Sequence, residues 1–264
     1  AFHFRNCVYM ARFAEIMNAA EDRENYLRKA MDTKTFWNSR FVNAEGLTCC
    51  ADGKLCDTQA SYAIALSCGV VSDAWKKGFA DALARKTKAC GCTVQTGFFG
   101  TGPLNPALCD GGYPELALAL IQQTSYPSWL YPVTQGATTV WERWDSYTTE
   151  KGFGGQNSMN SFNHYSLGSV VSWLYEYVLG IRRDEEKPGY GHFTLQPVIM
   201  GFSHASGQIE TPYGRIESSW NKIGDTVEYR CSIPANTEAT LILNGKMRNL
   251  PSGKYVFMDK VVEQ

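Results

Sequence analysis

Apolar residues recur every three or four positions through the first 180 residues, which is the spacing of amphipathic helices. Near the start, Met10, Phe13 and Met17 share one helical face, and residues 21–41 predict a second helix that completes a hairpin. Further helices are predicted in segments with the same spacing: TQASYAIALSCGV, SDAWKKGFADALARK, ELALALIQQ and SFNHYSLGSVVSWLYEYVLG. The first part of the chain is therefore predicted to be a series of helix pairs.

The periodicity changes in the last third of the chain. Lys187-Pro188-Gly189 interrupts the helical pattern, and residues 226–233 alternate between apolar and polar, as in a half-buried strand. Asn244-Gly245 is a strong hairpin turn signal. We predict a mainly α fold with an all-β C-terminal domain that forms an antiparallel β-sandwich. The predicted domains are residues 1–186 and 187–264.

Charge and hydropathy exclude several classes of partner. Lys and Arg number 25 and Asp and Glu number 26, so the formal net charge is -1 and no basic field is available for nucleic acid or an anionic membrane. No apolar run of about 18 residues occurs, and the first residues lack the pattern of a signal peptide. We therefore expect a soluble protein without nucleic-acid or membrane partners.

The sequence contains no convincing metal or cofactor motif. Its nine cysteines are odd in number and spread through predicted helices, which argues against a disulfide scaffold and favours buried thiols. Neither a C-x-x-C pair nor a close pair of histidines gives zinc-ligand spacing. The glycine-rich residues 97–102 lack the Lys-Ser/Thr of a phosphate loop and are predicted to form a tight loop.

Aromatic and hydrogen-bonding residues gather between residues 126 and 165. A sugar packs its C–H face on an aromatic ring, while its hydroxyls need carboxylate, amide, Arg or His partners. The candidates for sugar contacts in this stretch are Trp129, Trp141, Trp144, Glu142, Asn163 and His164. The alternative is that Trp141 and Trp144 anchor a short helix in the core, with Glu142 on its wet side, and that His164 is a core residue.

Glu142 is the carboxylate best suited to glycosidic cleavage, which needs one carboxyl as acid and a second as base or nucleophile. Its two flanking indoles favour the protonated carboxyl, whereas the guanidinium of Arg143 favours the ionised form, and the sequence leaves open which effect is larger. Gly152, Gly154 and Gly155 are predicted to form the bend that follows this segment.

Four segments carry a resemblance to a known family: QTGFFGT, YPSWLYPVTQGATTVWERWDS, MNSFNHYSLGSVVSWLYEYVLGI and PGYGHFTLQP. They resemble the C-terminal part of bacterial α-L-rhamnosidases of glycoside hydrolase family 78. The resemblance implies part of an (α/α)6 barrel followed by a β-sandwich. It also implies inverting cleavage of terminal α-L-rhamnose from glycosides, with no metal in the chemistry, and a cytoplasmic or periplasmic location in a bacterium.

The same resemblance implies roles for individual residues. The Glu of the W-E-R-W motif is the general base in the family, which assigns that role to Glu142. The His of the N-H-Y motif contacts the sugar, which assigns that contact to His164. Trp129, Trp141, Trp144 and Asn163 are the further sugar contacts that the resemblance suggests.

The chain departs from the family pattern in one respect. The upstream motif R-E-x-x-G-W-x-G-D, which carries the general acid, does not occur in it, and about seven or eight helices are too few for a twelve-helix barrel. We expect a fragment that lacks the general acid and covers its exposed helix faces either by re-packing or by forming a homo-oligomer. Two alternatives remain, a noncatalytic carbohydrate-binding protein and another (α/α)6-barrel exo-glycosidase.

Overall fold

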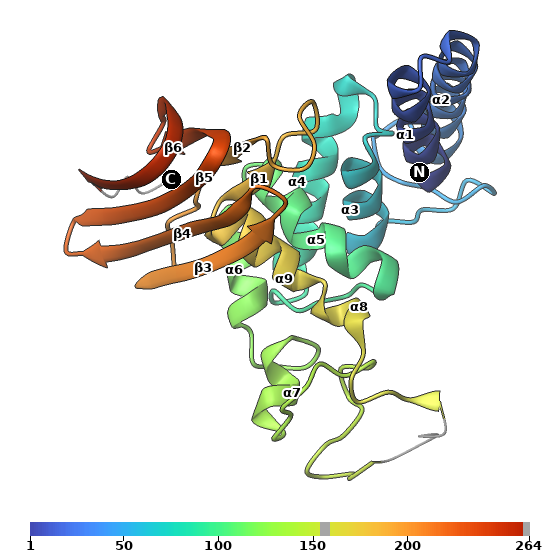
Figure 1. Ribbon diagram of the computed structural model, residues 1–264. Helices are drawn as coiled ribbons and strands as arrows, with labels where there is room; N and C mark the ends of the chain where they lie inside the picture. The colour runs from blue at the N-terminus through green and yellow to red at the C-terminus, as the bar shows by residue number, and fades with distance from the viewer. Residues whose placement is uncertain (154–158, 261–264) are drawn as a thin grey trace. The chain divides into compact units, whose positions relative to one another are not determined.

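The computed structural model describes residues 1–153 and 159–260, and the chain divides into two compact units, Ala1–Ser169 and Val170–Gln264 (Figure 1). The first unit is helical and the second is built around a β-sheet, which confirms a mainly α protein with an all-β C-terminal part. The predicted division between residues 186 and 187 stays a prediction, and it falls in the turn between the first two strands.

The first unit consists of helices that pack in sequence-adjacent pairs. They are α1 (Phe2–Ile16), α2 (Ala20–Phe41), α3 (Gln59–Cys68), α4 (Asp73–Ala89), α5 (Phe98–Asp110), α6 (Pro114–Gln122), α7 (Leu130–Thr134) and α8 (Tyr165–Gly168). Helix α1 lies along α2, α3 packs on α4 and α5, and α5 packs on α6 (Figure 1). The predicted helical hairpins are confirmed.

The core of this unit lies between α3, α4 and α5. Tyr62 of α3 meets Phe79 of α4 edge to face at 5.2 Å, and both side chains are fully buried. Helix α3 begins with a capping box in which Thr58 and Ser61 satisfy each other's backbone N–H groups, and it ends at Gly69 in the left-handed conformation. Local sequence signals therefore set the ends of the central helix.

The prediction of a tight loop at residues 97–102 is wrong, because this stretch forms the first turns of α5. Gly100 is a helical residue packed against α3, where an added Cβ would lie 2.9 Å from the Cβ of Ala60. The glycine serves the close approach of two helices and does not serve a turn. Composition alone does not separate these two uses of glycine.

Helix α1 presents its larger apolar residues to solvent. Its buried face consists of Cys7, Ala11 and Ala14, whereas Phe13 and Ile16 are 58% and 61% exposed. The helix also ends at Ile16, so Met17 lies outside the helix that was predicted to carry it. The first hairpin therefore carries an uncovered apolar surface, as expected from the sequence.

The second unit starts with two short helical segments and continues as strands. Its elements are α9 (Val170–Trp173), the π-helical segment η2 (Leu174–Val178), β1 (Ile181–Arg183), β2 (His192–Leu195), β3 (His204–Thr211), β4 (Gly214–Ile223), β5 (Thr226–Leu243) and β6 (Lys246–Lys260). The single helix predicted from Ser161 to Gly180 is therefore wrong in detail, since regular helix begins only at Tyr165, is interrupted at Ser169 and ends in a π turn.

The strands form one sheet in the order β1-β2-β5-β4-β3, with β6 also paired to β5 (Figure 1). The alternation predicted for residues 226–233 is confirmed, because Val227, Tyr229, Cys231 and Ile233 are all buried. A register shift after Ile233 divides β5, whose first half pairs with β4 and whose second half pairs with β2.

The turn between β5 and β6 is the one that Asn244-Gly245 predicts, with φ angles of 50° and 75°. Among the described strands the pairings are antiparallel except that of β2 with β5, which is parallel. The prediction of a wholly antiparallel arrangement is wrong for this pair. The strands β3 and β4 separate β2 from β5 in the chain, which provides the long connection that a parallel pair needs.

The cysteines are less uniformly buried than predicted. Cys7, Cys49, Cys68 and Cys231 are buried, but Cys50 is exposed. Burial raises the pKa of the Cys231 thiol to about 12, because the ionised form would lie in an apolar environment.

Candidate functional site

Two segments of the first unit, residues 139–142 and 161–164, lie side by side. The His164 N–H donates to the Val140 carbonyl at 2.8 Å, and the Glu142 N–H donates to the Ser161 carbonyl at 2.9 Å. The Thr139 hydroxyl also donates to the carbonyl of Phe162. The W-E-R-W and N-H-Y motifs are therefore joined through their backbones.

Glu142 is half-buried and is held at one of its two carboxylate oxygens. Its Oε2 accepts a hydrogen bond from the Ser161 N–H at 2.7 Å, whereas Oε1 accepts none from the residues that the structure describes. The Arg143 guanidinium donates to the carbonyl of Met159 at 3.3 Å. Within the described part of the chain it makes no ion pair with Glu142. One carboxylate oxygen is thus fixed and the other is available to a ligand or water.

His164 is half-buried and caps a helix, so it is not a core histidine. Its Nδ1 accepts a hydrogen bond from the Ser166 N–H at 3.2 Å at the start of α8. Its ring stacks between Phe98 and Tyr165, with centroid distances of 5.0 and 5.4 Å. Because Nδ1 is an acceptor, the neutral ring carries its proton on Nε2, which has no partner among residues 1–153 and 159–260.

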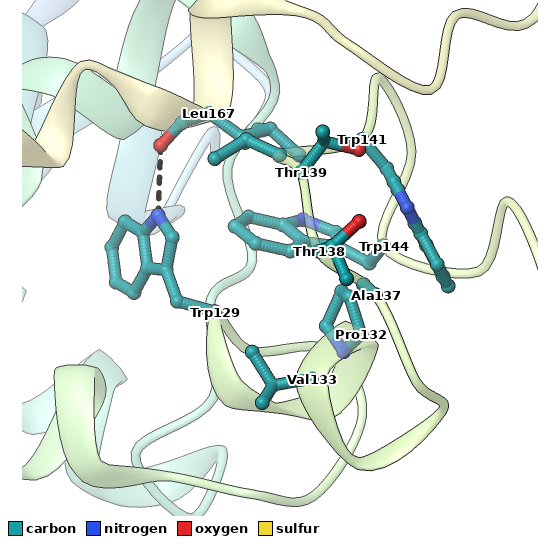
Figure 2. Close-up of a pocket in the computed structure, with 10 residues that line it drawn as sticks. Trp129, Pro132, Val133, Ala137, Thr138, Thr139, Trp141, Trp144 and Leu167 are labelled. Carbon is teal, nitrogen blue, oxygen red and sulfur yellow. Dashed lines mark hydrogen bonds between the residues drawn. The ribbon is translucent and has the colours of Figure 1, made fainter.

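Three of the predicted aromatic residues line one hollow of about 230 Å³ (Figure 2). The indole rings of Trp129 and Trp144 are nearly perpendicular, with centroids 5.5 Å apart. The Trp129 Nε1–H donates to the Leu167 carbonyl at 2.8 Å, drawn dashed in Figure 2, and this bond fixes the ring. Trp141 also contributes to the lining but is only 5% exposed.

The remaining lining residues include both apolar and hydroxyl-bearing side chains. Pro132 and Val133 of α7 and Leu167 are apolar, while Thr138 and Thr139 bring hydroxyl groups (Figure 2). A small ligand with one apolar face and several hydroxyls matches such a lining. The two threonines could not be predicted from the sequence, since isolated hydroxyl residues are common on any surface.

The structure separates the predicted site residues into two groups. The tryptophans share the hollow, whereas Glu142, Asn163 and His164 are not among its lining residues. Asn163 is exposed, and Glu142 lies in the chain between two of the lining tryptophans. The alternative that Trp141 and Trp144 belong to a short helix is wrong, because residues 141–144 form no helix.

Part of the predicted glycine bend is visible. Gly152 has a φ of 62° and is bridged to Thr148, so it does form a turn. Gly154 and Gly155 lie outside the described residues. Ser161 and Phe98, which contact Glu142 and His164, were not predicted, because one acts through its backbone and the other through a stacking contact.

Within residues 1–153 and 159–260 no group of three or more His, Cys, Asp and Glu side chains is arranged to hold a metal ion. No helix in the same part of the chain has the length and apolar character to cross a bilayer.

The chain matches two families of known proteins. Residues 1–178 match the bacterial alpha-L-rhamnosidase 6 hairpin glycosidase domain, and residues 180–256 match the bacterial alpha-L-rhamnosidase C-terminal domain. Two curated relatives are alpha-L-rhamnosidases. The one from Formosa agariphila is 34% identical over 247 residues, or 91% of this chain and 25% of its own length. The one from Streptomyces avermitilis is 38% identical over 191 residues, 72% of this chain and 18% of its own length.

Solved structures give the same result. The rhamnosidase of Aspergillus terreus superposes with a TM-score of 0.90 over 98% of this chain and 30% of that protein, at 28% identity. The Streptomyces avermitilis alpha-L-rhamnosidase complexed with L-rhamnose superposes with a TM-score of 0.85 over 97% and 26%, at 30% identity. The helix pairs are therefore part of a six-hairpin, or (α/α)6, domain followed by a β domain, and the chain spans less than a third of the length of these relatives.

Proposed function

Because the chain belongs to the bacterial alpha-L-rhamnosidase family, we propose that it supplies part of the active site of an enzyme that hydrolyses terminal α-L-rhamnose from glycosides. The observation that carries this proposal is Glu142, which lies in the chain between two tryptophans that line a hollow. One of its carboxylate oxygens is fixed by the backbone, and the other has no partner among the residues that the structure describes. The substrate would be a rhamnose-containing glycoside or oligosaccharide. The compartment would be the cytoplasm or periplasm of a bacterium.

In this proposal Glu142 is the general base of an inverting reaction. Its free Oε1 takes a proton from water while that water attacks the anomeric carbon, and Oε2 stays on the Ser161 N–H. The acid that protonates the leaving oxygen then lies about 6.5–9.5 Å away, which leaves room for the water. No metal takes part in these steps.

The sugar would be held by aromatic and polar contacts. Trp129 and Trp144 offer the hollow to the C–H face and the methyl group of rhamnose, with Trp141 behind them as part of the wall. The His164 Nε2–H and the exposed Asn163 amide would bind hydroxyl groups.

We expect the general acid to come from a carboxyl outside these 264 residues, since the R-E-x-x-G-W-x-G-D motif is absent from them. The 264-residue chain alone should then bind L-rhamnose but release little or no nitrophenol from an aryl α-L-rhamnoside. Turnover by the isolated chain that is lost in Glu142→Gln would contradict this expectation.

The test of the base uses the longer enzyme that contains this chain. Glu142→Gln should lower kcat by about 10²- to 10⁴-fold, the range for loss of a general base. Asp145→Asn, which removes an exposed carboxylate three residues away, is the matched control and should leave kcat nearly unchanged. Release of β-L-rhamnose, followed by NMR of the fresh product, would establish inversion.

Two other functions remain in competition. A noncatalytic carbohydrate-binding protein would bind L-rhamnose equally well after Glu142→Gln and show no turnover in the longer protein. Another exo-glycosidase would bind D-glucose in preference to L-rhamnose in a calorimetric titration. The tryptophan-lined hollow favours a sugar ligand in both cases, so these assays compare chemistries at one site.

We also propose that a second copy of the chain covers the apolar surface of the first hairpin, giving a homo-oligomer. Phe13, Ile16 and Met17 on one side and Met31 and Phe36 of α2 on the other are each at least 58% exposed. Light scattering should then report a dimer that dissociates in Phe13→Glu. A monomer at all concentrations would contradict the proposal.

A further inference from the structure

A second hollow, of about 380 Å³, lies entirely within the second compact unit. It is lined by residues of α9, η2, β1 and β3 and of the turn before β2. Its polar lining consists of Ser172, Tyr175, Glu176, Arg183 and Tyr190. Its volume is within the range of small-molecule sites, which begins at about 300 Å³.

Two uncommon backbone conformations place the tyrosines of this hollow. Tyr175 and Glu176 belong to the π-helical segment η2, a rare conformation that is frequent at functional sites. Tyr190 has a φ of 68°, which is unusual for an aromatic residue. Its ring packs edge to face on the fully buried Phe193, at 6.3 Å. Conformations of this kind cost free energy and persist where the surroundings enforce them.

The charges in this hollow compensate each other. Arg183 Nη2 lies 3.7 Å from Glu176 Oε1, so the hollow presents one cation and one anion as a pair. The Glu176 backbone is held in turn by Arg182, whose Nε–H donates to its carbonyl at 3.0 Å and whose guanidinium lies over the Tyr177 ring. A lining with paired charges favours an uncharged ligand that both donates and accepts hydrogen bonds.

Three hydroxyl groups around the hollow are unused. Those of Ser172, Tyr175 and Tyr190 make no hydrogen bond within the described part of the chain. Each can donate one bond and accept another. Together with the ion pair, these hydroxyl groups favour a polar ligand over a purely apolar one.

The rest of the lining is aliphatic. Val171 is 49% exposed, while Ile181 is buried and Ile209 is half-buried. These side chains offer a place for a methyl group next to the hydroxyl-binding groups. The combination of two aromatic rings, paired charges, free hydroxyls and aliphatic carbon matches a pyranose ring that carries a methyl group.

We propose that this hollow, here called the Tyr175–Tyr190 hollow, is a second carbohydrate site that binds a neutral 6-deoxy pyranose. Hydroxyls of the sugar bond to Glu176, Arg183 and the free hydroxyl groups, the ring lies against a tyrosine, and the methyl group contacts Ile181 and Ile209. The Tyr175–Tyr190 hollow shares no residue with the site around Glu142, so this proposal does not depend on whether Glu142 is catalytic.

The test uses methyl α-L-rhamnopyranoside as the probe and NMR of the 264-residue chain with labelled isoleucine methyl groups. Ile181 and Ile209 line the Tyr175–Tyr190 hollow, whereas the tryptophan-lined hollow contains no isoleucine, so isoleucine shifts report on the proposed site alone. Substitution of each isoleucine by valine assigns the signals. Both methyl signals should move and saturate together on titration.

Variants and a matched sugar then test the contacts. Tyr175→Phe and Arg183→Met should each weaken binding by about fivefold, the effect of losing one hydrogen bond, while Tyr213→Phe, outside the hollow, should not. Methyl α-L-mannopyranoside, which differs only by the hydroxyl on C6, should bind at least fivefold more weakly than the rhamnoside.

Three results would overturn the proposal. The first is that the methyl signals of Ile181 and Ile209 do not shift at sugar concentrations up to about 50-fold above the dissociation constant of the tryptophan-lined hollow. If that hollow binds no sugar, the limit is about 50 mM sugar. The second is equal binding of the two glycosides, and the third is stronger binding of a uronic acid than of either. In Trp144→Ala, sugar binding at the tryptophan-lined hollow should be lost while the sugar still shifts the Ile181 and Ile209 signals. This result would separate failure of the proposed function from failure of this inference.

Discussion

Ser161 and Glu142 hold each other through two hydrogen bonds. The Glu142 N–H donates to the Ser161 carbonyl at 2.9 Å, and the Ser161 N–H donates to Glu142 Oε2 at 2.7 Å. The carboxylate of the proposed base is therefore oriented by the backbone of a residue 19 positions later. Since the donor is a backbone group, every substitution of the serine except proline keeps it.

A proline at position 161 removes the N–H that holds Glu142. In the longer enzyme, Ser161→Pro should lower kcat about 10²-fold with a change in KM of a few-fold at most, since a poorly oriented base affects the chemical step. Ser161→Ala keeps the N–H and is the control. An equal loss in both variants would mean that the side chain, and not the backbone bond, matters, and circular dichroism would check that the proline variant folds.

The packing of α3 against α5 predicts opposite effects for two glycine substitutions. Gly100→Ala would place a Cβ 2.9 Å from that of Ala60 and should lower the free energy of unfolding by about 1–3 kcal/mol. Gly78→Ala, in α4, meets nothing within 4 Å and should raise it by about 0.5–1 kcal/mol. Urea unfolding of both variants measures the difference, and stabilisation by Gly100→Ala would contradict the packing argument.

Asp57 predicts an acid limit to stability. Partial burial alone would raise its pKa, but hydrogen bonds from Lys86 and Tyr62 and the charge of Arg85 outweigh burial and hold the pKa below its ordinary value of 3.8. A carboxyl with a lowered pKa in the folded state stabilises above its unfolded pKa and loses that effect as the pH falls through the folded value. The free energy of unfolding should therefore drop below about pH 4.

The Asp57→Asn variant tests this limit. It should be about 1–3 kcal/mol less stable at pH 7, because it leaves Lys86 without its partner, and its stability should fall less steeply below pH 4. The exposed Asp73→Asn is the matched control for the size of the loss at pH 7, since the Asp73 side chain is 86% exposed and pairs only on the surface with Lys76. An unchanged acid limb in Asp57→Asn would contradict the assignment.

Tyr62 predicts an alkaline limit. Burial, together with its hydrogen bond to Asp57, raises the pKa of Tyr62 to about 12 from an ordinary value of 10.0. A group whose pKa is raised in the folded state stabilises fully below the unfolded value and loses this effect as the pH rises toward the folded value. Stability should therefore decline between pH 10 and 12, and Tyr62→Phe should reduce the slope by up to one proton. A slope unchanged in Tyr62→Phe would assign the decline to other groups, such as Tyr229, whose pKa burial also raises.

Elements that are determined by a short-range pattern of residues could be predicted from the sequence. The alternation of residues 226–233 and the Asn244-Gly245 turn were both correct, because each depends on the pleat or on the backbone preferences of two adjacent residues. Helix α5 could not be predicted, because Gly100 is required by close packing against Ala60, which is distant in the sequence. The π turn and the parallel pairing of β2 and β5 have the same kind of origin, since neither leaves a local pattern.

The candidate site follows the same rule. The sequence predicted that Trp129, Trp141 and Trp144 would serve one surface, and the structure brings them to one hollow. It gave no sign of Ser161, whose contribution is a backbone N–H that every residue except proline has. Side-chain chemistry was therefore visible in the sequence, whereas the backbone groups that orient it were not.

The register shift in β5 has a consequence for how the second unit opens. Because this one strand is hydrogen-bonded to β4 before Ile233 and to β2 from Glu238 onward, and to β6 along both parts, unfolding of β5 breaks the pairing of both parts of the sheet at once. We therefore expect β5 to open as one unit in amide hydrogen exchange, so that protection of Val227 and Leu241 is lost at the same rate.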